Sequence, residues 1–265
     1  MRFNQNSKVK YTDQLGQVLD INLPPQRIIS LVPSQTEFLF DLGLDDRICG
    51  ITRFCIHPAD KVKTKPLIGG TKRFDFEKIK ELNPDLIIGN KEENYQEGIE
   101  QLKKGFPVWM SDIYNLQDAK AMMAEIGRIT GKEEEAAVII EGIQFPKISS
   151  NQTVAYFIWR KPYMVAASNT FINEMLAVFG LRNVFEGLQR YPEIEMEQLT
   201  ELKPDFIFLS SEPYAFSDKH IEEFSSFCPK ARVQVVDGEI FSWYGSRLRH
   251  APAYFEALRT KLGIR

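Results

Sequence analysis

Two glutamates, Glu92 and Glu212, hold equivalent places in a sequence that repeats itself, and they are its first candidates for chemistry. Each follows a short apolar run of the kind that forms a buried parallel strand. Ligands of open α/β sheets collect at the carboxyl ends of the strands, so we expect both carboxylates to face a bound ligand. There they can accept hydrogen bonds from ligand amides or join a metal, whereas a solvated acid at a helix start is the alternative interpretation.

Cys55 and His57 are a second candidate, because they stand close together on a loop that follows a predicted strand. A thiolate and an imidazole suit iron, cobalt or zinc, so the pair is a predicted metal site of two ligands. The alternative is that Cys55 packs in the core and His57 forms local hydrogen bonds. Two residues do not distinguish these interpretations, and both stay open at this stage.

Aromatic and cationic side chains gather in the predicted loops. Flat rings provide contact area for a large planar ligand. Arginine and lysine donate hydrogen bonds to ligand carboxylates or phosphates, and surface charge is the alternative for any one of them. For Trp159, which closes an apolar strand, a place in the core is the alternative. The predicted ligand-binding residues are Ser34, Arg53, Phe54, His57, Lys72, Glu92, Trp159, Arg160, Tyr163, Glu212, Tyr214, Trp243, Tyr244 and Arg247.

The sequence carries no signature of a catalytic site. It contains no Gly-x-Ser-x-Gly elbow, no P-loop and no His-Glu-x-x-His, and Gly69-Gly70 lacks the spacing of a dinucleotide fingerprint. Ser34 opens a helix but has no assigned base. We therefore predict no catalytic residue and no enzyme.

An internal repeat positions these residues. The stretch Lys78–Asn94 recurs half a molecule later at Glu197–Pro213, where Pro204 matches Pro84 at a shift of 120 positions (204 − 84). Each copy reads as the end of a helix, a Pro-Asp turn and a buried strand. The duplication predicts two α/β lobes.

The remaining elements follow from hydrophobic periodicity. In the first half, strands are predicted at 27–32, 47–51, 66–70, within 78–94 and at 107–110, and in the second half at 153–159, 163–167, within 197–213 and at 232–236. Ser34 and Glu37 have capping-box spacing at the start of a helix. The apolar period over 116–143 predicts one helix of about 45 Å at 1.5 Å per residue, although Gly127 and Gly131 weaken it.

Three parts are therefore predicted. Residues 1–113 form the N-terminal α/β lobe with an edge hairpin, residues 114–149 the bridging helix, and residues 150–265 the C-terminal α/β lobe.

Composition limits the classes of function. The 265 residues are 43% hydrophobic and 26% charged with a net charge of −3, which is typical of a soluble globular protein and gives nucleic acid no basic surface to bind. The longest apolar runs are too short to span a bilayer, so no membrane insertion is predicted. Cys49, Cys55 and Cys228 show no Cys-x-x-Cys spacing and are interpreted as reduced thiols.

The first ten residues contain no apolar segment, lipobox cysteine or small-residue cleavage site. If Met1 is the native start, the expected compartment is the cytoplasm. If an export signal was removed, the expected compartment is the periplasm or another extracytoplasmic space.

Several motifs in a fixed order carry a family resemblance. They are Ser30–Glu37, Leu42–Leu44, Leu82–Ile88 and the Trp243–Arg247 loop. In this order the chain resembles the helical-backbone substrate-binding proteins of ABC transporters, which include cobalamin and ferric-siderophore receptors, over nearly its whole length. The loops at 52–58, 69–72, 91–94, 158–164 and 212–214 are most similar to the branch of that family without an export signal.

The resemblance implies an α/β fold of two Rossmann-like lobes with parallel sheets, bridged by one long helix, with the ligand in a cleft between the lobes. It implies non-catalytic binding of a tetrapyrrole-like or metal-chelate ligand, most of all a corrinoid such as cobalamin, and no covalently bound cofactor. Glu77 and Glu197, again 120 positions apart (197 − 77), match glutamates that dock onto arginines of an ABC permease.

Two alternative functions remain at this stage. One is a receptor for haem or a siderophore. The other is a corrinoid- or tetrapyrrole-processing enzyme, such as a metal chelatase, that uses His57 with Glu92 as a buried pair.

Overall fold

The computed structural model describes residues 8–148 and 150–264 and divides them into two units. Residues 1–7, on which part of the export-signal prediction rests, lie outside the described residues. The first unit runs to Ile113 and adds 117–143 and Tyr244–Arg247, and the second unit contains 114–116, 144–243 and the chain from Leu248 onward. Each unit is built on its own mostly parallel sheet.

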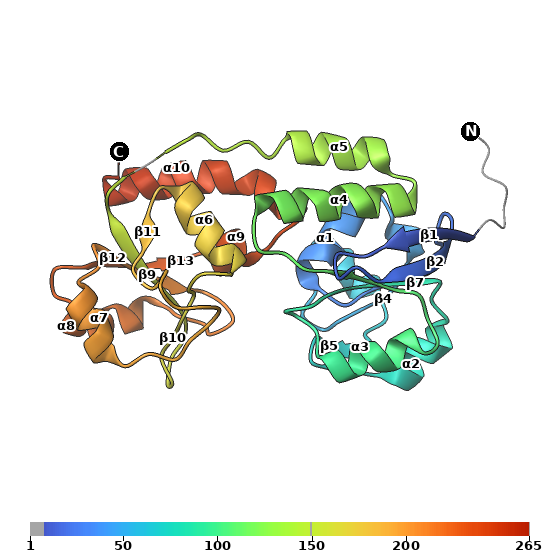
Figure 1. The fold of residues 1–265 in the computed structure, drawn as a ribbon, viewed down its shortest axis with the longest axis horizontal. Coiled ribbons are helices and arrows are strands. Elements are labelled where there is room, and N and C mark those ends of the chain that lie inside the picture. The colour runs from blue at the N-terminus through green and yellow to red at the C-terminus, as the bar shows by residue number, and fades with distance from the viewer. Residues whose placement is uncertain (1–7, 149, 265) are drawn as a thin grey trace. The chain divides into compact units, whose positions relative to one another are not determined.

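The sheet of the first unit has the strand order β4-β3-β7-β8, all parallel. These strands are β3 (Ile28–Ser30), β4 (Ile48–Ile51), β7 (Leu86–Asn90) and β8 (Val108–Ser111). The helices are α1 (Pro33–Asp41), α2 (Phe76–Leu82), α3 (Gln96–Lys103), α4 (Leu116–Thr130) and α5 (Glu133–Glu141). An antiparallel hairpin of β1 (Lys8–Thr12) and β2 (Val18–Asn22) precedes them, as the alternation of the sequence predicts (Figure 1).

The sheet of the second unit has the order β10-β9-β12-β13, with β11 also paired to β9. Its strands are β9 (Thr153–Trp159), β10 (Met164–Val165), β11 (Arg182–Asn183), β12 (Phe206–Ser210) and β13 (Arg232–Val236). Its helices are α6 (Phe171–Phe179), α7 (Met196–Leu202), α8 (Ile221–Phe227), α9 (Gly238–Ser242) and α10 (Ala251–Leu262). The two repeated strands, β7 and β12, are buried at every position, as the continuous apolar runs predict.

The Pro-Asp turn of the repeat does the same work in both units. Asp85 accepts the backbone N–H groups of Gln26 (2.7 Å) and Arg27 (2.8 Å), just before β3. Asp205 accepts the backbone N–H of Thr153 (2.7 Å) and its hydroxyl (2.9 Å) at the start of β9. Each carboxylate therefore satisfies backbone donors at the start of the central strand, which is β3 in the first unit and β9 in the second. It also holds the strand that follows the turn, β7 or β12, beside that central strand.

The prediction of one helix over 116–143 is wrong. Helix α4 ends at Thr130, Gly131 takes the left-handed conformation (φ 71°), and α5 starts two residues later alongside α4 (Figure 1). A Cβ added at Gly127 would lie 2.5 Å from the Cβ of Ala136. The glycines that weaken the predicted helix thus allow its second part to fold back onto its first.

Of two further local predictions, one holds in part and the other is wrong. The segment 66–70 joins the central sheet only through a parallel bridge of Leu67 with Ile51, whereas β5 (Gly69–Gly70), in which Gly69 has φ of 99°, pairs with β6 (Arg73–Phe74). Helix α1 begins at Pro33 with Val32 as its cap and no capping side chain, so Ser34 and Glu37 form no capping box. No helix within the described residues is long and apolar enough to cross a membrane.

We predict that Asp205→Ala lowers the free energy of unfolding of the second unit by about 1.5–3 kcal/mol, because the charged carboxylate that accepts the backbone N–H and the hydroxyl of Thr153 is lost. Urea denaturation followed by circular dichroism measures the change. The matched control is Glu201→Ala on α7, whose exposed side chain should contribute less than about 0.5 kcal/mol. Equal midpoints for the two variants would contradict the role assigned to Asp205.

Candidate functional site

In the first unit, the residues that follow β7 form a tightly held turn. The side-chain oxygen of Asn90 accepts the backbone N–H groups of Glu92 (2.8 Å) and Glu93 (3.1 Å). The ammonium of Lys72 donates to the backbone carbonyl of Glu92 (2.6 Å), so the structure brings two predicted ligand residues together. Glu92 is half-buried, and Lys72 is exposed.

A buried asparagine that sequence reasoning did not single out supports this turn. Asn94 accepts the backbone N–H of Asn90 (2.9 Å) and donates to the carbonyls of Leu31 (3.4 Å) and Thr71 (3.2 Å). It therefore ties the ends of β3 and β7 to the loop that carries Lys72. The signal in the sequence is an asparagine at each end of the Asn90–Asn94 stretch, where turns favour this residue type.

Cys55 is buried in the core of the first unit, with 5% of its surface exposed. Its sulfur lies 3.1 Å from the hydroxyl of Thr36 and 3.3 Å from that of Thr52. Burial raises the pKa of the Cys55 thiol, so the group stays protonated at neutral pH and is not the thiolate that metals bind. These contacts favour the packing interpretation that the sequence left open.

His57 lies half-buried on the same loop. Among the described residues, no group of three or more histidine, cysteine, aspartate or glutamate side chains could hold a metal ion. The chelatase alternative needed a buried His57–Glu92 pair, and both residues are only half-buried.

Arg53 and Phe54 lie together on the surface of the first unit. The guanidinium carbon of Arg53 is 5.8 Å from the centre of the Phe54 ring, and both side chains are exposed. A Cβ on Gly70 would lie 3.0 Å from the Phe54 ring and 3.3 Å from Nε of Arg53. The two predicted ligand residues therefore pack onto the glycine strand β5.

The segment Tyr244–Arg247 belongs to the first unit although its flanking residues belong to the second. The guanidinium of Arg247 donates to both carboxylate oxygens of Glu37 on α1, at 2.9 Å each. The two side chains are 14% and 13% exposed, and the ring of Tyr244 is buried. The guanidinium of Arg247 is thus paired with Glu37. Ser34, on the same helix as Glu37, is buried close to this loop, because its backbone carbonyl lies 3.0 Å from a Cβ built on Gly245.

In the second unit, Trp159 ends β9 with 39% of its surface exposed. Its ring meets the ring of Tyr214 edge-on, with centroids 5.6 Å apart and an interplanar angle of 70°. Tyr214 in turn packs against the buried Phe216 at 4.6 Å. Trp159 is therefore not a core residue, and it presents a supported aromatic surface at the carboxyl end of a strand.

A third residue organises two other predicted ligand residues of this unit. Glu223 on α8 accepts Nε of Arg160 (2.8 Å) and the hydroxyl of Tyr163 (2.5 Å). Burial alone would raise the pKa of the Glu223 carboxyl, but the hydrogen bonds from Tyr163 and Arg160 lower it. Burial and the bond to Glu223 raise the pKa of Tyr163 to about 12. No pattern in the sequence marks Glu223, because it stands on a helix of mixed composition.

Glu212, at the end of the second repeat, supports the Trp243 loop. Its Oε1 atom accepts the indole N–H of Trp243 and the hydroxyl of Ser242, both at 2.8 Å. Burial raises the pKa of the Glu212 carboxyl, and the hydrogen bonds from Ser242 and Trp243 oppose the rise only in part. Trp243 is itself buried, with 8% of its surface exposed. Glu212 and Trp243, both predicted to contact a ligand, are therefore hydrogen-bonded to each other.

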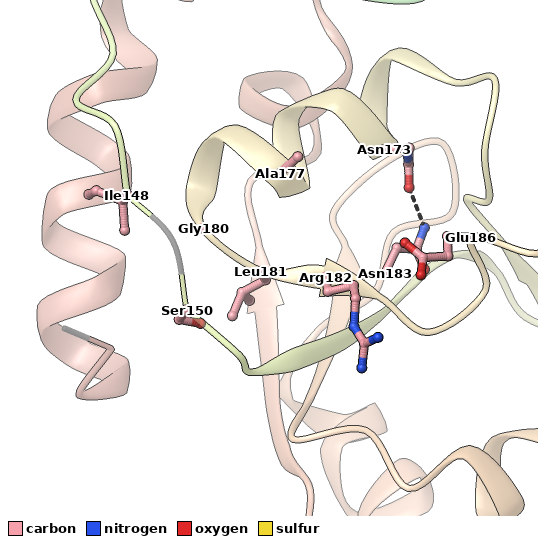
Figure 2. A pocket seen from close by; sticks show the side chains of 9 residues that line it. All are labelled: Ile148, Ser150, Asn173, Ala177, Gly180, Leu181, Arg182, Asn183 and Glu186. Atoms are coloured by element: carbon pink, nitrogen blue, oxygen red, sulfur yellow. Dashed lines mark hydrogen bonds between the residues drawn. The ribbon is translucent and has the colours of Figure 1, made fainter.

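A separate hollow of about 240 Å³ lies in the second unit between α6, β11 and the stretch before β9 (Figure 2). Arg182 and Glu186 lie at its wall, and Asn183 donates to Asn173 there (2.9 Å). None of the predicted ligand-binding residues lines it. The position of this hollow therefore does not connect it with the predicted ligand-binding residues.

We predict opposite effects for two substitutions of Glu212. A carboxyl whose pKa is raised by folding stabilises the folded chain less as the pH rises from the usual carboxyl range through the raised pKa. Glu212→Gln keeps the acceptor and removes the charge, so at pH 7 it should unfold at an equal or higher urea concentration than the unchanged chain. Its advantage should shrink as the pH falls to about 4, where the carboxyl is protonated.

Glu212→Ala removes the acceptor and should cost about 1–3 kcal/mol, because the buried indole N–H of Trp243 loses its partner. Urea denaturation at several pH values separates the two effects. If the Gln variant is as unstable as the Ala variant, the charge rather than the acceptor holds the loop.

The chain is similar to known binding proteins in sequence and in fold. A vitamin B12-binding protein of Vibrio campbellii is 26% identical over 200 residues, which cover 71% of this chain and 72% of the relative. An uncharacterized ABC transporter substrate-binding lipoprotein of Bacillus subtilis is 26% identical over 258 residues, which cover 91% of this chain and 82% of the relative.

Among solved structures, the periplasmic vitamin B12 binding protein of Vibrio cholerae has a TM-score of 0.73 at 22% identity and covers 91% of this chain and 98% of that chain. This likeness concerns the fold, and it confirms the predicted α/β class with parallel sheets. The model of the family described as periplasmic binding protein matches residues 28–227, more than half of the sequence. The resemblance seen in the sequence is thereby confirmed, and the chain belongs to the periplasmic binding protein family.

Proposed function

We propose that this chain is the non-catalytic substrate-binding protein of an ABC transporter and that its ligand is a corrinoid or a similar large planar metal chelate. The single observation that carries the ligand class is the exposed ring of Trp159 supported edge-on by Tyr214. A flat conjugated ligand gains contact area and favourable ring geometry on such a surface. The vitamin B12-binding relative supports the corrinoid as the first choice.

The proposed ring contact lies in the second unit, where Trp159 and Tyr214 form the surface and Arg160 and Tyr163 lie fixed by Glu223. Polar contacts of the first unit come from Lys72 and Glu92, whose turn is held rigid. A preformed turn loses little conformational entropy when it binds. Arg247 is left out of the contact set because its side chain is only 14% exposed, and Glu212 is left out because its carboxylate holds the buried indole of Trp243. The cleft between the lobes stays a prediction from the sequence.

Glu77 and Glu197 have the same place in the two units. Each is the second residue of the helix that precedes the repeated strand, and each is exposed. Equivalent carboxylates on two units suit recognition by paired arginines of a permease, which steers encounter through charge. We propose these two glutamates as the docking points.

The compartment follows from this docking. A binding protein that delivers its ligand to an importer must meet the outward face of the permease, so we propose an extracytoplasmic location. The Bacillus relative is described as a lipoprotein, which is in keeping with this proposal. The proposal contains no catalytic step.

For ligand binding, we predict that Trp159→Ala weakens the binding of hydroxocobalamin about tenfold, since a lost ring contact of about 1.4 kcal/mol corresponds to that factor. Trp159→Phe should keep most of the affinity. Isothermal titration calorimetry measures the change, and the visible spectrum of the bound ligand confirms occupancy. The matched control is Leu188→Ala, since Leu188 is 38% exposed in the same unit.

The proposal of a planar ligand fails if hydroxocobalamin, haemin and a ferric siderophore all give neither heat nor a spectral change at about 100 μM, well above the usual dissociation constants of specific ligands. It also fails if Trp159→Ala and Leu188→Ala change the affinity for the ligand equally.

For docking, we predict that Glu77→Arg and Glu197→Arg each weaken binding to a detergent-solubilised vitamin B12 importer of the source organism at least about tenfold, because each places a cation against the arginines of the permease. Binding of hydroxocobalamin should stay unchanged. Surface plasmon resonance at two salt concentrations measures the effect, with Glu201→Arg as the control. A double variant that binds the importer as tightly as the unchanged chain would remove both glutamates from the interface.

A further inference from the structure

We propose that the first unit carries a second ligand site for a zwitterion of the amino-acid or short-peptide type, separate from the aromatic surface of the second unit. The site is a hollow of about 550 Å³. The residues that line it include two arginines, Arg53 and Arg73, and two acidic residues, Asp75 and Glu77. The volume falls in the range of small-molecule pockets, about 300–1,000 Å³.

The charges of the hollow are not neutralised by one another. Throughout residues 8–148 and 150–264, which the structure describes, neither arginine forms a salt bridge, and Glu77 accepts no hydrogen bond from a cation. Asp75 uses one carboxylate oxygen to accept the backbone N–H of Lys78 (3.0 Å), which caps α2 and fixes the direction of the side chain. Groups of both signs thus face one hollow without pairing.

Backbone geometry holds the two arginines in place. The backbone N–H of Arg53 donates to the carbonyl of Gly69 (2.9 Å), and the side chain of Arg53 packs on Gly70. Gly69 takes a φ of 99°, and a Cβ there would lie 2.3 Å from the carbonyl oxygen of Arg73. Only glycine allows this close turn, and the turn brings both guanidinium stems to the same wall.

The hollow also has an apolar part. Phe74 is buried and Phe76 half-buried, and their rings meet edge-on at 6.1 Å with an interplanar angle of 79°. Phe74 is supported from behind by Tyr95, whose ring centre is 4.9 Å away. The two phenylalanines provide a fixed apolar contact for a ligand side chain.

These features together select the ligand. A guanidinium donates paired N–H groups to a ligand carboxylate, and a protein carboxylate accepts N–H groups from a ligand ammonium. A ligand with charge of only one sign would be attracted by either the arginines or the acidic residues and repelled by the others. A free amino acid or short peptide carries both charges, and an aromatic or aliphatic side chain would contact the phenylalanines.

The experiment uses the whole isolated chain without corrinoid or permease, so that its result is independent of the proposed function and of the docking role of Glu77. The probe is glycyl-phenylalanine, titrated while the backbone amide signals of Gly69 and Gly70 are followed by NMR. Two matched probes remove one charge each, since N-acetyl-glycyl-phenylalanine lacks the ammonium and glycyl-phenylalaninamide lacks the carboxylate.

The expected result is that the dipeptide shifts the signals of Gly69 and Gly70 in a saturable manner and that each matched probe binds at least about tenfold more weakly, which is the loss of one charge-assisted contact. Arg53→Gln and Arg73→Gln should weaken the dipeptide and leave the affinity of the amide probe nearly unchanged. Glu77→Gln should weaken the dipeptide and the amide probe, which both carry the ammonium, and leave the affinity of the acetylated probe nearly unchanged. Arg182→Gln, an exposed arginine at the other hollow, is the control.

Three outcomes would overturn the proposal. The first is an absence of saturable shifts at Gly69 and Gly70 up to about 10 mM dipeptide, which is weaker than specific binding. The second is equal binding of the dipeptide and of the acetylated probe, which would show an anion site only. The third is an equal loss of affinity in Arg182→Gln and Arg53→Gln. The four substituted side chains, those of Arg53, Arg73, Glu77 and Arg182, are all exposed, so the variants should fold. Circular dichroism verifies this.

Discussion

Each unit depends on a carboxylate that accepts hydrogen bonds from the first residues of a neighbouring strand. Asp85 does this for the strand that starts after Arg27, and Asp205 does it for the strand that starts at Thr153. The interaction couples a tight turn to the central strand and therefore sets which strands are adjacent. Since ligands of such sheets bind at the carboxyl ends of the strands, the register fixed at one edge decides which loops meet at the opposite edge.

The two copies of this device have the same scaffold and different ends. After the first copy, Asn90 and Asn94 hold the turn through their side-chain oxygens, which accept backbone N–H groups. After the second copy, Glu212 itself supports the adjoining loop through Trp243 and Ser242. A duplicated sequence can thus keep the same turn and strand in both copies while different side chains hold the loop that follows.

The sequence predicts correctly those features that depend on the order of neighbouring residues along the chain. Hydrophobic periodicity predicted the buried strands around Ile87 and Ile207, and the repeat predicted two α/β units. It was insufficient where a contact joins distant residues. The pair of Arg247 with Glu37 spans 210 positions, and nothing near either residue indicates the other. Glu223 was missed for the same reason, since its partners lie on another element. The break at Gly131 was misjudged because the apolar period continues through it, whereas a left-handed residue ends a helix whatever its neighbours are.

The return of residues 244–247 to the first unit has a consequence for the order of folding. At the usual rate of synthesis, about 5–20 residues per second, the chain between residues 143 and 247 takes on the order of 5–20 s to emerge. During that time Glu37 has no access to Arg247, and helix α1 lacks the loop that covers it in the finished protein. The first unit is therefore the first to begin folding, yet it is completed only when almost the whole chain has left the ribosome.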